Sequence, residues 1–245
     1  MRIEYSIFSD KGMRDNNEDF ADGILLTSQT EGAFVLCDGL GGHGRGEVAS
    51  KLVVEQMLKV YKEMKNSKEF LKTAFEHSHK QLLDLQKKQN SQNEMKTTAV
   101  VLQIREDEIQ WAHIGDSRLY VFCKNKMQSR TLDHSVPQML VTAGEIKEKD
   151  IRNHPDRNRL LRVMGIEWDK PKYVIAESIM KKEGIAFLLC SDGFWEYIDE
   201  KHMEKCLKKA KSPKEWLDNM KEIIKKNGEN SDMDNFSAIT VMCEQ

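Results

Sequence analysis

Four aspartates stand at the ends of short apolar segments that have the character of β-strands: Asp38, Asp116, Asp192 and Asp234. Two of them, Asp38 and Asp192, follow apolar runs and precede glycine, which lets backbone approach a ligand closely. If these carboxylates converge, each pair at 4 Å repels by about 4 kcal/mol at an effective dielectric of 20. Hard divalent cations such as Mg²⁺ or Mn²⁺ offset that repulsion and prefer oxygen ligands. An Asp-Gly pair taken alone is more typical of a turn, but four such sites together favour a metal centre.

The segments that must position these aspartates have strand and helix patterns in separate blocks. Short strands are expected at residues 5–8, 33–37, 97–104, 108–114, 118–122, 173–176, 185–190 and 238–242. Apolar residues recur at helical spacing over 46–64 and again from 71 to 85, where Asn66 or Ser67 is expected to cap the helix. A Lys-rich helical region is expected at 200–226. These blocks predict stacked sheets covered by helices.

Two connections carry specific expectations. The turns 105–107 and 115–117 are short, so the three strands around them are expected to form an antiparallel meander. Residues 133–165 are polar and contain Pro137 and Pro155. So long an excursion in a compact domain is often functional.

Length and composition limit the classes of protein to consider. At 245 residues the chain can bury one large core, so residues 1–245 are expected to form a single domain. A formal charge of −2 gives no basic field for nucleic acid. Residues 1–10 lack an apolar signal segment, and no window approaches the ~18 apolar residues of a membrane span. Five scattered cysteines fit neither a disulfide framework nor a zinc site, which indicates a reducing cytoplasm.

Eight short motifs extend the acidic pattern along nearly the whole chain. In order, they are RDNNED at 14–19, CDGLGGH at 37–43 with GEVAS at 46–50, TTA at 97–99, HIGDSR at 113–118, DHS at 133–135, NRL at 158–160, SDGFW at 191–195 and DN at 234–235. Each motif is weak alone. Together, in this order, they resemble the metal-dependent protein phosphatases, the type 2C or PPM family, in their short bacterial form.

The resemblance implies an α+β fold, a four-layer αββα sandwich in which helices flank two antiparallel sheets. It implies a flap segment near 135–165 beside the active site, and His134, Glu145 and Asn158 are assigned to this region. It also implies a protein serine/threonine phosphatase, in which a metal-activated water hydrolyses phosphoserine and phosphothreonine in proteins. The expected partners are phosphorylated proteins, with a bacterial Ser/Thr kinase and its substrates among them. A monomer without membrane or nucleic-acid partners is expected.

The resemblance further assigns metal ligands by matching position. Asp38 is expected to bridge two Mn²⁺ or Mg²⁺ ions, and Asp192 and Asp234 to complete the ligands of the first. The Gly39 carbonyl, and Glu18 through water, are expected to serve the second ion. A third ion is expected at Asp116, shared with Asp192.

Other positions are assigned to the substrate and to ligand orientation. Arg14 is expected to grip the substrate phosphate, for which its fork geometry is suited. Arg14, Asp38, Asp192 and Asp234 therefore form the expected catalytic set. Asp19 and Asn235 are expected to orient ligands.

Two positions depart from the family pattern. Lys96 replaces the glycine usual before the TTA motif, and Leu40 stands where eukaryotic relatives carry a histidine thought to be the general acid. These departures leave open the substrate preference and the source of the leaving-group proton. His134 is expected either to order the base of the flap or to be purely structural, and His43 to shape the glycine loop.

The same residues argue against rival functions. A cysteine-dependent phosphatase is excluded because no cysteine has arginine six positions later. The P-loop-like stretch 41–47 has Glu47 in place of the required lysine. The remaining alternative is a catalytically silent relative that binds phosphoproteins as a regulatory module. Such a relative is expected to have lost metal aspartates, and all four are present.

Overall fold

Two antiparallel sheets face each other in the computed structural model, which describes residues 1–41, 45–91 and 94–244. The first sheet has the order β1 (Arg2–Asp10), β12 (Phe236–Glu244), β11 (Ile185–Cys190), β7 (Arg118–Cys123), β8 (Lys126–Arg130). The second has the order β10 (Ile179–Met180), β6 (Glu108–Ile114), β5 (Ala99–Ile104), β3 (Gly32–Leu40), β2 (Asp19–Leu25). Two short strands extend it: β4 (Lys96–Thr97) pairs with β3, and β9 (Val174–Ile175) pairs with β6.

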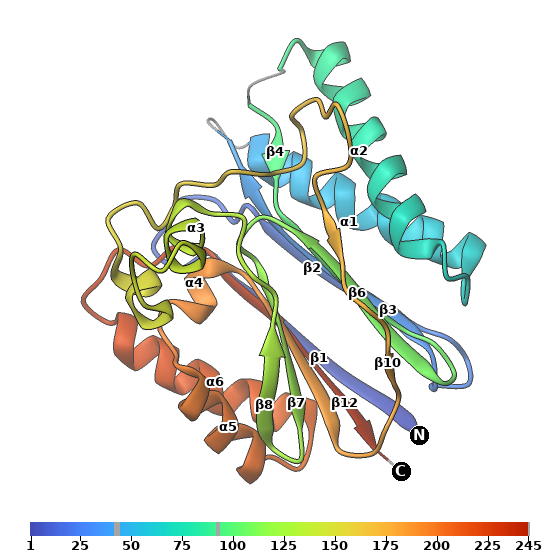
Figure 1. Cartoon of the computed structure of the whole chain (residues 1–245), viewed down its shortest axis with the longest axis vertical. Coiled ribbons are helices and arrows are strands. Elements are labelled where there is room, and N and C mark those ends of the chain that lie inside the picture. The colour runs from blue at the N-terminus through green and yellow to red at the C-terminus, as the bar shows by residue number, and fades with distance from the viewer. Residues whose placement is uncertain (42–44, 92–93, 245) are drawn as a thin grey trace.

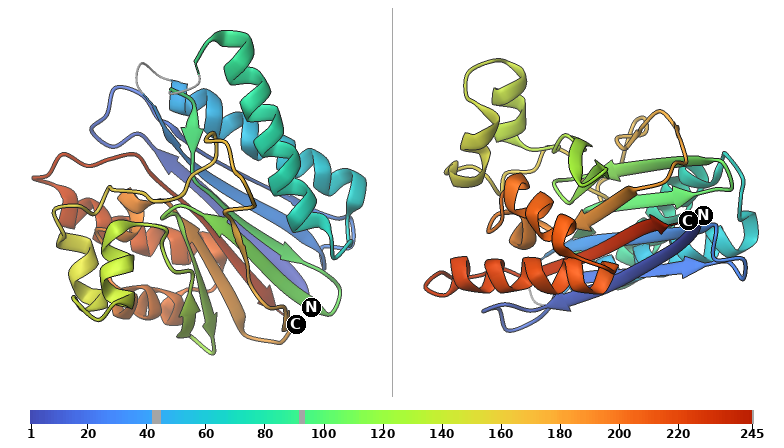
Figure 2. Two further views of the ribbon diagram at one scale, coloured as in Figure 1. Left: turned by 45° about the horizontal axis from the view of Figure 1, so that its top comes forward. Right: turned by 90° about the horizontal axis from the view of Figure 1, so that it is seen from below.

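Helices cover the outer face of each sheet, as Figures 1 and 2 show. The pair α1 (Arg45–Met64) and α2 (Phe70–Gln89) packs on the second sheet, and α5 (Glu200–Lys209) and α6 (Pro213–Gly228) pack on the first. The expected four-layer αββα sandwich is therefore confirmed. The chain begins and ends on neighbouring strands, because β1 pairs with β12.

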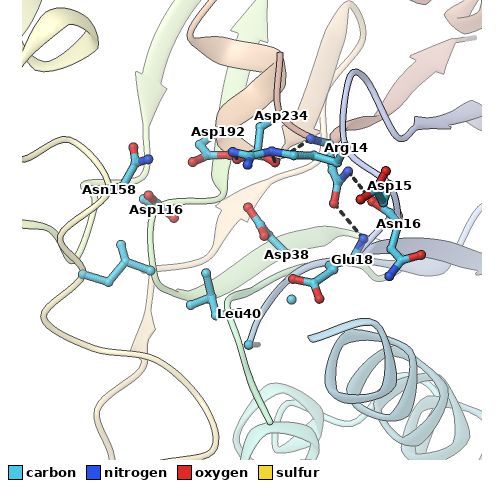
Figure 3. Close-up of a pocket in the computed structure, with 14 residues that line it drawn as sticks. Arg14, Asp15, Asn16, Glu18, Asp38, Leu40, Asp116, Asn158, Asp192 and Asp234 are labelled. Atoms are coloured by element: carbon cyan, nitrogen blue, oxygen red, sulfur yellow. Dashed lines mark hydrogen bonds and ion pairs between the residues drawn. The ribbon is translucent and has the colours of Figure 1, made fainter. Parts of the chain in front are cut away.

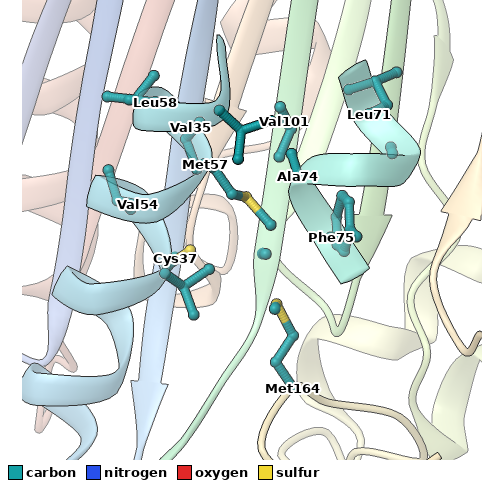
Figure 4. Close-up of a cluster of buried hydrophobic side chains, with 14 of the residues drawn as sticks. Val35, Cys37, Val54, Met57, Leu58, Leu71, Ala74, Phe75, Val101 and Met164 are labelled. Atoms are coloured by element: carbon teal, nitrogen blue, oxygen red, sulfur yellow. The ribbon is translucent and has the colours of Figure 1, made fainter. Parts of the chain in front are cut away.

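Alternation along the central strands builds three apolar layers. On β3, Val35 and Cys37 face the α1–α2 pair, whereas Phe34 and Leu36 lie between the sheets. Figure 4 shows the outer layer, where Val35 and Cys37 meet Met57 of α1 and residues of α2. Because β3 is buried on both faces, its end is held rigidly. Asp38 lies at this end.

The expected meander over 97–122 is wrong. Strands β5 and β6 do pair, but β7 pairs with β11 in the other sheet, so residues 115–117 cross from one sheet to the other. The reason lies in the burial of β7 on both faces: Leu119 and Val121 lie between the sheets, and Tyr120 and Phe122 pack toward α5 and α6. Such a strand is best accommodated inside a sheet, and β7 lies between β11 and β8. Asp116 consequently stands on a crossover between the sheets.

The excursion after β8 contains α3 (Val136–Thr142) and a 3₁₀ helix (Glu148–Asn153), and α4 (Asp192–Trp195) follows β11. In Figure 1, α3 and α4 lie at the same end of the sandwich. The expected cap of the second helix is wrong: α2 begins at Phe70, and the Ser67 hydroxyl accepts from the Glu69 amide, 3.2 Å away, before the helix starts. Every helix in the described ranges is too short or too polar to cross a membrane.

Candidate active site

A cavity of about 580 Å³ opens at one end of the sandwich (Figure 3). Residues from six separate segments of the chain line it: Arg14, Asp15, Asn16, Glu18, Asp38, Gly39, Leu40, Gly41, Asp116, Asn158, Leu160, Asp192, Asp234 and Asn235. We call it the carboxylate pocket. It brings together every residue expected to bind metal, together with Arg14, Asn158 and Asn235. Asp19, His134 and Glu145 do not line it.

Asp38 is positioned by two threonines. The Thr98 hydroxyl accepts from the Asp38 amide at 3.0 Å, and the Thr97 hydroxyl donates to the Asp38 carbonyl at 2.8 Å. The Thr98 hydroxyl also contacts the hydroxyl of Ser117 at 2.7 Å, which joins β3 to the crossover. The backbone of Asp38 is thereby fixed by hydrogen bonds on both sides.

The backbone of Asp116 is fixed by a hydrogen bond from a buried tryptophan. The indole N–H of Trp195, a residue of α4 that is 1% exposed, donates to the Asp116 carbonyl at 3.0 Å. The guanidinium of Arg118 lies 3.4 Å from the centre of the Trp195 ring and forms a bidentate pair with Asp133 at 2.8 and 2.7 Å. The crossover, α4 and the base of the flap are thus one connected unit.

The glycines that follow Asp38 and Asp192 allow two backbones to approach each other. A Cβ on Gly39 would lie 2.2 Å from the Gly46 carbonyl oxygen, and one on Gly193 would lie 2.3 Å from the Asn235 carbonyl oxygen. These glycines therefore also have a structural role, beside the ligand approach expected of them. They let α1 and β12 close against the strand ends, which brings Glu18 and Asp234 to the pocket.

Arg14 and Asp234 form a bidentate pair. The Nε and Nη2 atoms of Arg14 donate to the two carboxylate oxygens of Asp234, each at 2.9 Å. Both side chains are partly exposed, 47% and 40% respectively. The arginine expected to bind phosphate therefore reaches the pocket, but in this structure it is engaged with a residue expected to bind metal.

Asn235 ties the loop that carries Arg14 and Glu18 to the start of β12. Its Oδ1 accepts from the Glu18 amide at 2.7 Å, and its Nδ2 donates to the carbonyls of Lys11 and Asn16 at 2.9 Å each. Asp19 lies behind the pocket, 5% exposed, and its Oδ2 accepts from the Ser191 hydroxyl at 2.7 Å. Its Oδ1 has no hydrogen-bond partner among the described residues. Both positions suit the orienting role expected of them.

Burial and mutual repulsion raise the carboxyl pKa values in and behind the pocket. The pKa of Asp38 lies well above its usual value because of burial, then the charges of Asp19 and Asp192. Burial and then Asp234 raise the pKa of Asp192 to about 6. Burial raises the pKa of Asp19 to about 7, although Ser191 and Ser237 oppose the shift. Apart from Asp234, which pairs with Arg14, the carboxylates that line the pocket form no ion pair with a described residue.

The donors in the pocket suit a hard divalent cation, since they are carboxylate and carbonyl oxygens. Among the described residues, however, no three acidic, histidine or cysteine side chains stand close enough together to enclose a metal ion as they are placed. Both oxygens of Asp234 face Arg14. The carboxylate and carbonyl oxygens of the pocket therefore fit a divalent cation in charge and chemistry. The Oδ1 atom of Asp19, which has no hydrogen-bond partner among the described residues, adds to the negative charge behind the pocket. To bind a cation, Asp234 must first release Arg14.

The expected flap residues separate in space. Asn158 lines the carboxylate pocket, whereas Glu145 is exposed and away from it. His134 fastens the flap base to the crossover: its Nδ1 accepts from the Gly115 amide at 3.2 Å, and its own amide donates to the Gly115 carbonyl at 2.9 Å. These hydrogen bonds are compatible with both roles expected of His134, ordering of the flap base and a purely structural one. His43 lies outside the described residues.

Several residues that shape the site stand out in the sequence only as members of the short motifs. They are Thr97, Thr98, Ser117 and Trp195. Paired hydroxyls beside a strand end could have suggested that Thr97 and Thr98 bind backbone. Trp195 gave no such signal, because its partner is a carbonyl 79 residues away in sequence.

Comparisons with known proteins agree with this architecture. The family model described as protein phosphatase 2C matches residues 13–236. The serine/threonine phosphatase stp of Listeria welshimeri is 30% identical over 217 residues, covering 86% of this chain and 85% of that protein. The protein phosphatase PhpP of Streptococcus pneumoniae is 27% identical over 203 residues, covering 80% of each chain.

Solved structures show the same fold. The serine/threonine phosphatase Stp1 from Staphylococcus aureus has a TM-score of 0.87 at 27% identity, covering 100% of this chain and 96% of that one. The catalytic domain of the phosphatase PstP, solved with two manganese ions, has a TM-score of 0.84 at 23% identity, covering 99% of each chain. The PstP likeness concerns the fold alone.

Proposed function

This chain belongs to the protein phosphatase 2C family and is a protein serine/threonine phosphatase, and we propose that the carboxylate pocket is its divalent-metal centre. The family match extends over residues 13–236, so the activity belongs to nearly the whole chain. We take residues 1–245 as one catalytic domain, since a continuous apolar layer between the sheets joins β1 to β12.

One observation carries the proposal. Asp38, Asp116 and Asp192 come from three different elements into one pocket, and none forms an ion pair with a described residue. Burial raises the pKa values of all three. The charges of Asp19 and Asp192 add to the shift of Asp38, that of Asp192 adds to the shift of Asp116, and that of Asp234 adds to the shift of Asp192. Buried carboxylates that are left unpaired destabilise a fold. A divalent cation would offset the repulsion that the fold has gathered there.

The family resemblance assigns the ligands, and all of them line the pocket. Asp38, Asp192 and Asp234 would hold one Mn²⁺ or Mg²⁺ ion, and Asp38, the Gly39 carbonyl and Glu18 a second. Asp116 would share a third with Asp192. When bound, such ions supply Lewis-acid activation of water for attack on phosphorus at neutral pH. The catalytic domain of PstP was solved with two manganese ions, so Mn²⁺ is the metal to test first.

The other side chains bind and orient. Arg14 would bind the substrate phosphate through its fork once Asp234 has released it. Asn235 would hold the Glu18 backbone in place, and Asp19 would brace Ser191 beside Asp192. Leu40 and Leu160 form apolar walls of the pocket. Because position 40 is a leucine, it has no imidazole that could donate a proton to the leaving oxygen. His134 would order the flap through Gly115, and Asn158 would face the substrate from the flap.

The substrates are phosphorylated proteins, whose phosphate a Ser/Thr kinase of the same cell must have added. We propose that such a kinase and its targets are the partners, and that the enzyme acts as a cytoplasmic monomer in bacterial signalling. The nearly balanced charge of −2 offers no general surface for nucleic acid.

Phosphate release from a phosphothreonine peptide tests the metal centre. Protein treated with EDTA should be inactive, and Mn²⁺ should restore activity. Asp38→Asn should abolish turnover, and Asp107→Asn, at an exposed turn, should not. Full turnover after rigorous chelation would exclude the metal role. Tight peptide binding without turnover under every metal condition would instead support the silent regulatory module.

A further inference from the structure

A second hollow, of about 820 Å³, lies beside the carboxylate pocket and is mostly apolar. Its floor includes Trp111 and His113 of β6. Four apolar side chains that line it are 42–57% exposed: Leu132, Met139, Leu161 and Val174. A cluster of exposed apolar side chains in a hollow marks a binding surface more often than scattered ones do. We call this hollow the flap groove.

Consecutive residues of the flap line different hollows. Asn158 and Leu160 line the carboxylate pocket, whereas Leu161 and Arg162 line the flap groove. A hydrogen bond fixes the backbone at this boundary: the Leu161 amide donates to the His134 carbonyl at 2.7 Å. A polypeptide with one residue in the carboxylate pocket therefore needs to pass only this flap segment to reach the groove.

The groove is built on buried structure. Arg118 and Asp133, 2% and 1% exposed, form the bidentate pair under its floor. Arg130, 4% exposed, joins Asp133 at 3.3 Å and Gln138 at 2.9 Å. A groove supported in this way is largely preformed, so a partner loses little free energy in ordering it.

The accessible charge of the groove is positive. Among the described residues that line it, Asp133 is the one acidic residue, and it is buried between two arginines. Arg162 is exposed, and its guanidinium makes neither a hydrogen bond nor an ion pair with any residue in the described ranges. Apolar walls beside a free guanidinium are complementary to an apolar segment that carries a carboxylate.

We propose that the flap groove docks an extended apolar segment bearing an acidic side chain, in the same phosphoprotein whose phosphorylated residue enters the carboxylate pocket. This inference rests on the proposed function, because it concerns the substrate of that site. Apolar side chains of the segment pack against Leu161 and Met139, and its carboxylate pairs with Arg162. Docking beside the pocket raises the local concentration of the phosphorylated residue, so it lowers KM rather than raising kcat.

The test compares a short phosphothreonine peptide with a series of extended ones. Each extended peptide carries a leucine-rich segment ending in glutamate, placed on either side of the phosphothreonine and at several spacings. At least one register should lower KM about tenfold, which corresponds to about 1.4 kcal/mol, with kcat little changed. Leu161→Glu and Arg162→Glu should each abolish that gain and leave turnover of the short peptide unchanged.

Met180→Glu is the matched control, because Met180 is an exposed apolar residue, 65% accessible, that does not line the groove. It should keep the full gain. The proposal is overturned if no register lowers KM, if the gain survives in both groove variants, or if Met180→Glu loses it equally. A wild-type dimer in sedimentation that Leu161→Glu dissociates would assign the groove to a second copy instead. Failure of the proposed function is separate, since it shows with the short peptide alone, either as full turnover after chelation or as no turnover under any metal condition.

Discussion

Arg14 has two possible partners in the carboxylate pocket, and they exclude each other. Two of its guanidinium nitrogens are bound to Asp234 in this structure. Burial opposes its charge only weakly, and Asp234 raises the pKa of Arg14 chiefly through the hydrogen bond. An arginine in this position can move between a carboxylate and a phosphate with the same fork geometry.

Replacing Arg14 should weaken substrate binding. Loss of a charge-assisted phosphate contact costs about 1.5–3 kcal/mol, so Arg14→Ala should raise KM about 10- to 150-fold if the contact is equal in the ground and transition states. Arg14→Lys keeps the charge but loses the fork, so its KM should fall between the two. Initial rates on a phosphothreonine peptide measure this. Unchanged KM and kcat in Arg14→Ala would show that the residue does not touch phosphate.

The residues with strong local signatures were predictable from the sequence, and those defined by distant partners were not. An aspartate that follows an apolar strand and precedes glycine is a local pattern, and it predicted that Asp38 and Asp192 belong to the site. Thr98 and Trp195 act through backbone groups of other elements, and no local pattern shows which element will pack there. The pairing of Arg14 with Asp234 was equally unpredictable, because it joins residues 220 apart in sequence.

At the scale of elements, the crossover from β6 to β7 determines where Asp116 stands. A short turn predicts a hairpin only when both strands prefer the same sheet. Here β7 is apolar on both faces, and β11 offers a buried neighbour that β6 cannot. Local pattern therefore located the central strands and the two long helices, but it shortened β1 and β12 and missed β2 and β8. The sheet to which β7 belongs depends on packing across the whole core.

The buried pair beneath the crossover should carry much more stability than a surface pair. Asp133→Asn leaves the Arg118 charge unpaired at 2% exposure, so it should cost about 3–5 kcal/mol. Asp218→Asn, in α6, breaks an exposed pair with Lys214, whose side chains are 42% and 77% accessible, and should cost about 1 kcal/mol or less. Urea denaturation of both variants measures the difference. Equal losses would refute the assignment of Asp133 as the support of the crossover.

At the scale of the whole molecule, several buried groups make stability depend on pH, and acidification weakens the fold through some of them and strengthens it through others. Burial lowers the pKa of His79 to about 4, below the value near 6.5 of an unfolded chain. As pH falls below about 6.5, His79 binds a proton in the unfolded chain but not in the folded one. The folded state therefore loses stability as pH falls from about 6.5 to about 4. Asp19 and Asp192, whose pKa values are raised, act oppositely and gain stability as pH falls.

His79→Gln separates these contributions. His79 is 7% exposed and stacks on Trp168 with ring centres 3.6 Å apart, so removing its proton site should change the slope by at most about 1.4 kcal/mol per pH unit. Between pH 7 and 5, after chelation, acidification should lower the free energy of unfolding less, or raise it more, in the variant than in the wild type. Identical slopes would mean that His79 titrates alike in the folded and unfolded chains.

The most direct test of the metal centre counts the ions it binds. Protein stripped with EDTA is titrated calorimetrically with Mn²⁺, in the wild type, in Asp38→Asn and in Asp107→Asn. We predict that the wild type and Asp107→Asn each bind at least about two ions per chain, and that Asp38→Asn loses tight binding, because Asp38 stands between the other carboxylates of the pocket. The same count of tightly bound Mn²⁺ in all three proteins, or none in the wild type, would contradict the assignment of the carboxylate pocket as the metal centre.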